Sequence, residues 1–91
     1  MSKLRLPLHY AIIKHFEDGR PDCAEGVIRS LESDYAGYKL LALKDVEETL
    51  ATAKENGVLE EADFQLDGAG RLRILYRISD FGKDMVRRYI G

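Results

Sequence analysis

The sequence has one cysteine, two prolines and no tryptophan, and these shortages narrow what the protein can be. A lone cysteine, Cys23, forms no internal disulfide and no cysteine-rich zinc site, which predicts a reduced, intracellular protein. No apolar run approaches the ~18 residues of a membrane-spanning helix, and the first residues lack the apolar stretch of a signal peptide. We therefore expect a cytoplasmic protein with no membrane partner.

A large excess of charge of one sign is also missing. Fourteen Lys and Arg oppose sixteen Asp and Glu, so the net charge is −2. Because dedicated nucleic-acid binders are usually basic overall, binding to DNA would need a local basic patch. The composition, 45% hydrophobic and 33% charged, is typical of a globular chain. With no linker rich in Pro, Gly or Ser, we expect residues 1–91 to form a single domain.

Residues that commonly carry chemistry are sparse. His9 and His15 are six residues apart on an expected helix, where they point in different directions, so a metal would need ligands from elsewhere. Gly68 and Gly70 precede a strand, whereas the glycines of a phosphate-binding loop lead into a helix. A domain of this size also leaves little room for a cavity of ligand size. We expect no catalytic residues, no metal site and no cofactor.

Hydrophobic periodicity predicts three helices, a β-hairpin and a closing helix. The third helix would bury Val46, Leu50 and Ala53, and the segment 33–43 reads as a turn followed by extended or irregular chain. The expected helices cover residues 6–16, 22–32, 46–56 and 80–90, and the expected strands cover residues 58–66 and 71–78.

Side chains that can satisfy free backbone N–H groups mark the helix starts. Asp22 and Asp45 are each followed three residues later by a glutamate, the spacing of a capping box. Ser79 is a favourable N-cap for the closing helix. We therefore expect helices to begin at these three positions.

The hairpin is predicted to have one apolar face and one charged face. Alternation places Leu72, Ile74, Tyr76 and Ile78 on one side of the second strand, and the first strand is expected to turn Ala62, Phe64 and Leu66 inward. Acidic residues on the first strand would pair with the arginines of the second strand. These expected pairs join Glu61, Asp63 and Asp67 to Arg71, Arg73 and Arg77.

Two segments resemble parts of winged helix-turn-helix domains. Residues 46–61 (VEETLATAKENGVLEE) are similar to the third helix, the following glycine and the first wing strand of such domains. Residues 75–85 (LYRISDFGKDM) are similar to the end of the wing and the start of the closing helix. Transcriptional regulators of the MarR and PadR type share both features. The resemblance implies an α+β winged-helix fold with three helices, a β-hairpin wing and a C-terminal helix.

The resemblance further implies a small transcriptional regulator that binds DNA as a homodimer. In such proteins the third helix enters the major groove, and arginines on the wing can contact phosphates. The implied DNA contacts are Tyr38, Lys39, Lys44, Glu47, Glu48, Ala51, Arg71, Arg73 and Arg77.

The third helix departs from this pattern because it is acidic. From Lys44 to Glu55 the sequence has two basic and four acidic residues, and carboxylates repel phosphates. An alternative hypothesis is therefore a winged-helix module for protein–protein contact, in which the acidic third helix binds a basic partner protein without any binding of DNA.

The closing helix carries more apolar residues than docking on its own domain requires. Phe81, Met85 and Tyr89 lie along one line of the helix, and Val86 and Ile90 lie along a neighbouring line. If the first line faces the core, Val86 and Ile90 are left for another surface. We therefore predict a homodimer with Val86 and Ile90 in its interface, assisted by the first helix.

Overall fold

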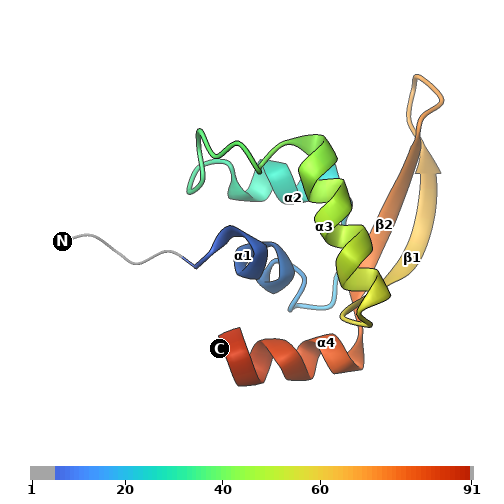
Figure 1. Ribbon diagram of the computed structural model, residues 1–91. Helices are drawn as coiled ribbons and strands as arrows, with labels where there is room; N and C mark the ends of the chain where they lie inside the picture. Colours follow the sequence, from blue (N-terminus) through green and yellow to red (C-terminus); the bar gives the residue numbers. More distant parts are fainter. Residues whose placement is uncertain (1–5, 91) are drawn as a thin grey trace.

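The helices and strands of the computed structural model, which describes residues 6–90, follow one another in the predicted order (Figure 1). Three helices precede an antiparallel hairpin, and a C-terminal helix closes the domain. This mixed α+β arrangement confirms the predicted winged-helix topology. The elements are α1 (Leu8–Lys14), α2 (Ala24–Leu31), α3 (Leu43–Glu55), β1 (Leu59–Leu66), β2 (Leu72–Ile78), α4 (Asp80–Met85) and its continuation as a π-helix, η1 (Val86–Ile90).

The hydrophobic core lies where the helices meet the lower part of the hairpin. The predicted stripe of α3 is confirmed, because Val46, Leu50 and Ala53 are all buried. Phe16 from the turn after α1 and Val27 from α2 complete its centre. Burying such side chains contributes about 1.5–3 kcal/mol each. The core therefore fixes α3 against the hairpin.

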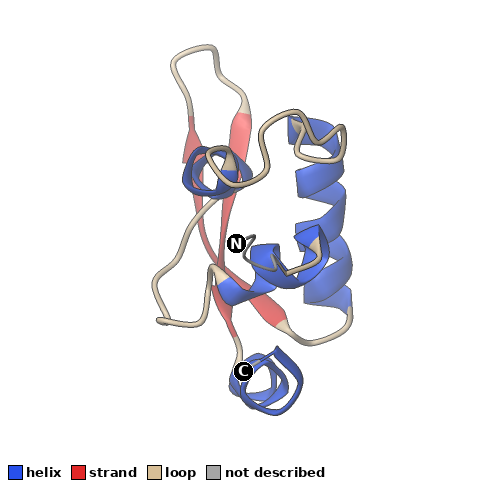
Figure 2. Ribbon diagram, turned by 90° about the vertical axis from the view of Figure 1, so that its left-hand side faces the viewer, coloured by secondary structure: helices blue, strands red, loops and turns tan. Residues whose placement is uncertain are grey.

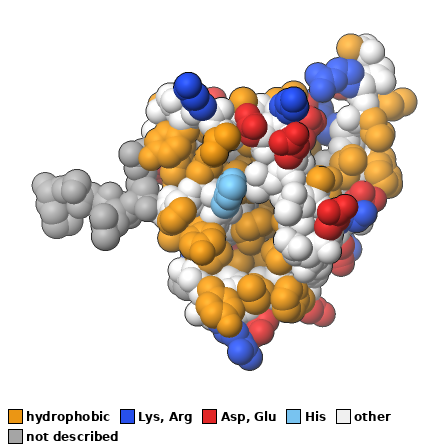
Figure 3. Space-filling view, viewed as in Figure 1, with side chains coloured by type: hydrophobic (Ala, Val, Ile, Leu, Met, Phe, Trp, Pro, Cys, Tyr) orange, Lys and Arg blue, Asp and Glu red, His pale blue; other side chains and the backbone are white. Residues whose placement is uncertain are grey.

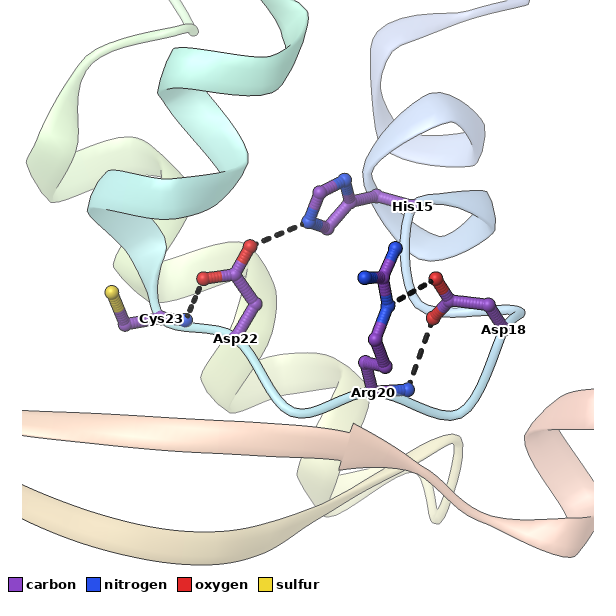
Figure 4. A network of polar contacts seen from close by, with 5 residues as sticks. All are labelled: His15, Asp18, Arg20, Asp22 and Cys23. Carbon is purple, nitrogen blue, oxygen red and sulfur yellow. Dashed lines mark hydrogen bonds and ion pairs between the residues drawn. The ribbon is translucent and has the colours of Figure 1, made fainter.

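The start of α2 differs from the prediction. Cys23, not Asp22, is its N-cap residue, and no side chain caps the helix. The Asp22 carboxylate instead accepts a hydrogen bond from the Cys23 N–H (2.8 Å) and lies 2.7 Å from His15 Nε2 (Figure 4). It also occupies the space beside Gly26, where an added Cβ would lie 1.9 Å from Asp22 Oδ1. The capping box was wrong because this carboxylate joins the end of α1 to α2.

The start of α3 is also earlier than predicted. The helix begins at Leu43, and its N-cap residue Ala42 has no side-chain cap, so the capping box at Asp45 was wrong. Leu43, the first residue of the helix, is partly buried and packs against the core, so apolar contact stabilises the start of α3. The connection between α2 and α3 contains turns and no strand. This agrees with the expected turn followed by irregular chain in residues 33–43.

A β-bulge brings the apolar residues of both strands to one face of the hairpin. Leu59 pairs with Ile78 at the base and Leu66 pairs with Leu72 near the tip, with the register shifting between Glu61 and Asp63. Directly opposed residues share a face, so the extra residue changes the phase of β1. Figure 2 shows that the hairpin extends beyond the helices. Its far part, with Phe64, Leu66 and Leu72, is exposed rather than covered as predicted.

An isolated β-bridge at the edge of the hairpin was not foreseen. Asp22 and Tyr76 form an isolated antiparallel bridge, with the N–H of each residue donating to the carbonyl oxygen of the other at 2.9 and 2.8 Å. A single bridging residue leaves no alternating pattern in the sequence to detect. The bridge attaches the chain between α1 and α2 to the edge of β2.

The closing helix faces the opposite way from the prediction. Ser79 caps α4 as expected, accepting a hydrogen bond from the Gly82 N–H at 2.9 Å. However, Val86 is buried (2% exposed), while Phe81 and Tyr89 are exposed (54% and 70%). Gly82 explains the reversal, because a Cβ there would lie only 2.2 Å from the carbonyl oxygen of Val58. The helix approaches the hairpin on its glycine side, and Val86, four residues on, lies on the same side.

Candidate nucleic-acid interface

The third helix presents three different surfaces. Its buried surface holds the core residues described above. A second surface lines a hollow opposite α1, and a third lines a cleft beside β2. The structure therefore separates two glutamates that are adjacent in the sequence: Glu48 faces the hollow, whereas Glu47 faces the cleft together with Ala51.

Three exposed basic residues lie at one edge of the domain: Lys39 in the α2–α3 connection, Lys44 in the first turn of α3, and Arg71 in the turn of the wing. We call these three residues the basic edge. In Figure 3, separate groups of Lys and Arg side chains lie along the top of the molecule, over the α2–α3 connection, α3 and the wing of Figure 1, with Asp and Glu side chains between them. Within residues 6–90, none of the three forms an ion pair. Their charge is available to an external anion.

The wing turn is held by a carboxylate that fixes where Arg71 emerges. Asp67 accepts hydrogen bonds from the backbone N–H groups of Ala69 and Arg71, both at 2.9 Å. The hydrogen bond from the Arg71 N–H is the main reason that the pKa of Asp67 is lowered. Gly70 completes the turn with a φ of 82°, a left-handed conformation that glycine adopts without strain.

The other two wing arginines are engaged within the domain. Arg73 Nε lies 3.5 Å from a carboxylate oxygen of Glu25 on α2, and Arg77 lies 3.9 Å from Glu60 across the hairpin. The predicted partners of Glu61 and Asp63 were wrong, and Glu61 instead lies 3.7 Å from Lys54. Asp67 does interact with the predicted arginines, because the charges of Arg73 and Arg71 help to lower its pKa. The Arg73 pair joins β2 to α2, two segments far apart in the sequence, so the pairing across the hairpin alone does not predict it.

The cleft between α3 and the wing is apolar with acidic walls. Its volume is about 200 Å³, and its lining includes Glu25, Glu47, Leu72 and Tyr76. Burial raises the pKa of the Tyr76 hydroxyl, and the charges of Glu61 and Glu47 raise it further. Arg73 also lines the cleft beside its partner Glu25, so the walls carry two carboxylates and one guanidinium group. The remaining negative charge disfavours a phosphate in the interior, so we expect any contact with nucleic acid at the rim of the cleft.

The two tyrosines before α3 have different environments. The Tyr35 ring is buried and its hydroxyl donates to the carbonyl oxygen of Leu6, whereas Tyr38 is half exposed beside it. Their rings meet edge to face, with centroids 5.1 Å apart. Tyr35 thus anchors the connection, and Tyr38 and Lys39 lie at its surface.

A hollow between α1 and α3 was missed by the sequence analysis. Its volume is about 470 Å³, so the expectation that the domain has little room for a ligand-sized cavity was wrong. The hollow forms because α1 and the hairpin base leave a gap beside α3, which only the three-dimensional packing reveals. It is lined mainly by apolar side chains, with Asp45 and Glu48 on one wall.

Together, the three helices, the hairpin wing and the strand bridge at Asp22 define a domain of winged-helix architecture. No protein-family model matches the sequence, and no curated protein is similar enough to indicate a relative.

In residues 6–90, no three His, Cys, Asp or Glu side chains come close enough together to hold a metal ion. None of the helices in this range is long and apolar enough to cross a membrane.

Proposed function

We propose that this protein binds DNA as a homodimer and acts as a transcriptional regulator of the MarR or PadR type. The observation that carries the proposal is the basic edge: exposed lysines and an arginine on three separate segments lie on the side of the domain that holds the start of α3 and the wing tip. Phosphate contacts of this kind position a protein on a duplex.

The arrangement suggests how the contacts divide. Lys44 approaches the phosphates at the start of α3, where the helix dipole also favours an anion. Arg71 on the wing reaches a neighbouring part of the backbone, and Tyr38 and Lys39 flank the other side. Glu47 and Ala51 follow on α3, where the carboxylate has a favourable partner in the amino group of a cytosine. Arg73 and Arg77 are less available for contact with phosphates because they already pair with carboxylates.

A second copy would double the contact with DNA, because a single domain of this size reads only one half-site. The structure requires a different surface for dimerisation from the one that the sequence predicted. Val86 is in the core, so the exposed aromatic residues Phe81 and Tyr89 on the C-terminal helix are better candidates. Ile90 is partly buried and remains at the margin of this surface.

Fluorescence anisotropy with a pool of random duplexes, repeated across a salt series, tests the proposal. Lys44→Glu and Arg71→Glu should each weaken binding about tenfold and lower the salt slope by about one unit. Lys83→Glu is the matched control, because it makes the same charge change at an exposed position on α4. Equal losses in all three variants, or no binding by the parent protein at low salt, would contradict the proposal.

One observation favours a second candidate, a module that binds a basic partner protein. The far part of the hairpin exposes Phe64, Leu66 and Leu72, and the neighbouring cleft carries Glu25 and Glu47. A helix with apolar and basic residues would complement this surface. A helical model peptide of Lys and Leu should then bind, and Leu66→Ser should weaken that binding while leaving binding to DNA unchanged.

A further inference from the structure

The hollow between α1 and α3 has the size and lining of a small-molecule site. Its volume of about 470 Å³ falls within the range of about 300–1,000 Å³ that is common for ligand pockets. Apolar and aromatic side chains from four parts of the chain contribute to its walls (Figure 3). They are Tyr10 and Ile13 from α1, Leu40 from the α2–α3 connection, Ala53 from α3 and Val58 before β1.

One wall of the hollow is negatively charged. Asp45 and Glu48 lie one turn apart on α3 and both line it. Within residues 6–90, neither carboxylate forms an ion pair or accepts a hydrogen bond. The neighbouring Thr49 hydroxyl donates to the backbone carbonyl oxygen of Asp45, not to its carboxylate. The described lining contains no lysine or arginine. Among the described residues, the two carboxylates therefore share the hollow with the imidazole of His9 but with no lysine or arginine.

We propose that this hollow binds a small amphipathic organic cation. The apolar body of the ligand would cover Tyr10, Ile13 and Leu40, and its cationic group would lie beside the carboxylates of Asp45 and Glu48. Opposite charges attract more strongly next to an apolar wall than in bulk water. The exposed ring of Tyr10 adds a favourable surface for a cation.

The hollow can also receive a ligand with a longer apolar part. A second hollow of about 330 Å³ lies between α1 and the C-terminal helix and shares Tyr10, Ile13 and Val58 with the first. Its other lining residues, including Met85 and Tyr89, are apolar or aromatic. The carboxylates are at one end of this continuous surface, so the ligand would bind in one orientation.

Binding here would connect to the DNA-binding surface through α3. The helix that supplies Asp45 and Glu48 to the hollow also carries Lys44 and Glu47 on its other sides. A ligand that changes the affinity for DNA must be affected by DNA to the same degree. The proposal for the hollow does not, however, require that the protein binds DNA.

Two ions of nearly identical shape and opposite charge provide the test. Isothermal titration calorimetry should show that tetraphenylphosphonium binds at least about tenfold more tightly than tetraphenylborate. Glu48→Gln combined with Asp45→Asn should remove this preference while leaving the hollow the same size. Glu47→Gln is the matched control, because it removes a carboxylate from the neighbouring position that faces away from the hollow.

Several outcomes would overturn the proposal. Equal binding of the two ions would mean that only apolar contact is involved. An equal loss of preference in the Glu47→Gln control would mean that net charge, rather than this hollow, attracts the cation. Thr52→Trp should fill the hollow and abolish binding of the phosphonium ion, and unchanged binding by this variant, with a normal unfolding transition, would place the ion elsewhere. If DNA does not bind but the preference holds, only the proposed function fails.

Discussion

Leu59 and Leu66 belong to the same strand and the same face of the hairpin, yet they have opposite environments. Leu59 at the base is 2% exposed, whereas Leu66 near the tip is 72% exposed. Their partners across the hairpin, Ile78 and Leu72, differ in the same way. Alternation in a sequence thus identifies the apolar face of a strand, but it does not show how far the helices extend beneath that face.

The largest expected effect is a difference in the free energy of unfolding between leucine-to-alanine substitutions at the base and at the tip of the hairpin. Leu59→Ala should lower the free energy of unfolding by about 2–5 kcal/mol, because it leaves a cavity in the core. Leu66→Ala should change it by less than about 0.5 kcal/mol, as for other surface sites. Urea unfolding of both variants measures the difference. Similar losses would mean that something covers the far part of the hairpin.

The base of the hairpin can also be disturbed from the side of α4. Gly82→Ala should cost about 1–3 kcal/mol, because the new Cβ would meet the carbonyl oxygen of Val58 and the side chain of Ile78. Gly68→Ala is the matched control in the wing turn, where an added Cβ meets nothing within 4 Å. A thermal melt that shows no difference between the two variants would contradict the close approach of α4.

Two arginines near the start of β2, one on each side of Leu72, differ in a smaller way. Arg73→Ala should lower stability by about 0.2–1 kcal/mol, because its ion pair with Glu25 is only partly buried. Arg71→Ala should leave stability within about 0.5 kcal/mol of the parent. The combined variant Arg73→Ala and Glu25→Ala measures the interaction of the pair. A purely additive loss would show that the two charges do not interact.

The smallest expected effect is at the wing tip and concerns pH. The lowered pKa of Asp67 means that its stabilisation of the turn is present above its unfolded pKa and is lost as the pH falls through the folded pKa. An NMR titration should therefore place its midpoint below the ordinary value of 3.8. A midpoint at or above that value would mean that the carboxylate does not accept the two backbone hydrogen bonds.

The sequence predicted those features that depend on neighbouring residues. The order of helices and strands, the apolar stripe of α3 and the cap at Ser79 all follow from local spacing and are confirmed. The role of Asp22 was not predictable because its partner, His15, belongs to another segment. The facing of α4 was not predictable because the close approach of Gly82 to Val58 decides it.

The candidate site was less predictable than the fold. Lys39, Lys44 and Arg71 were identified from the resemblance, and all three are exposed in the structure. The pairing of Arg73 with Glu25 and the hollow beside Glu48 both depend on how distant segments pack. Periodicity assigns a residue to a side of a helix, but it does not identify what lies opposite.

The bridge between Asp22 and Tyr76 has a consequence for how the chain folds during synthesis. Asp22 also contacts His15 and the start of α2, so one residue joins two helices to a strand that is translated much later. Contacts between residues far apart in sequence form slowly, because a long loop must close first. We therefore expect α1 and α2 to reach their final arrangement on the ribosome only after Tyr76 has emerged, so that the domain folds after its wing is complete.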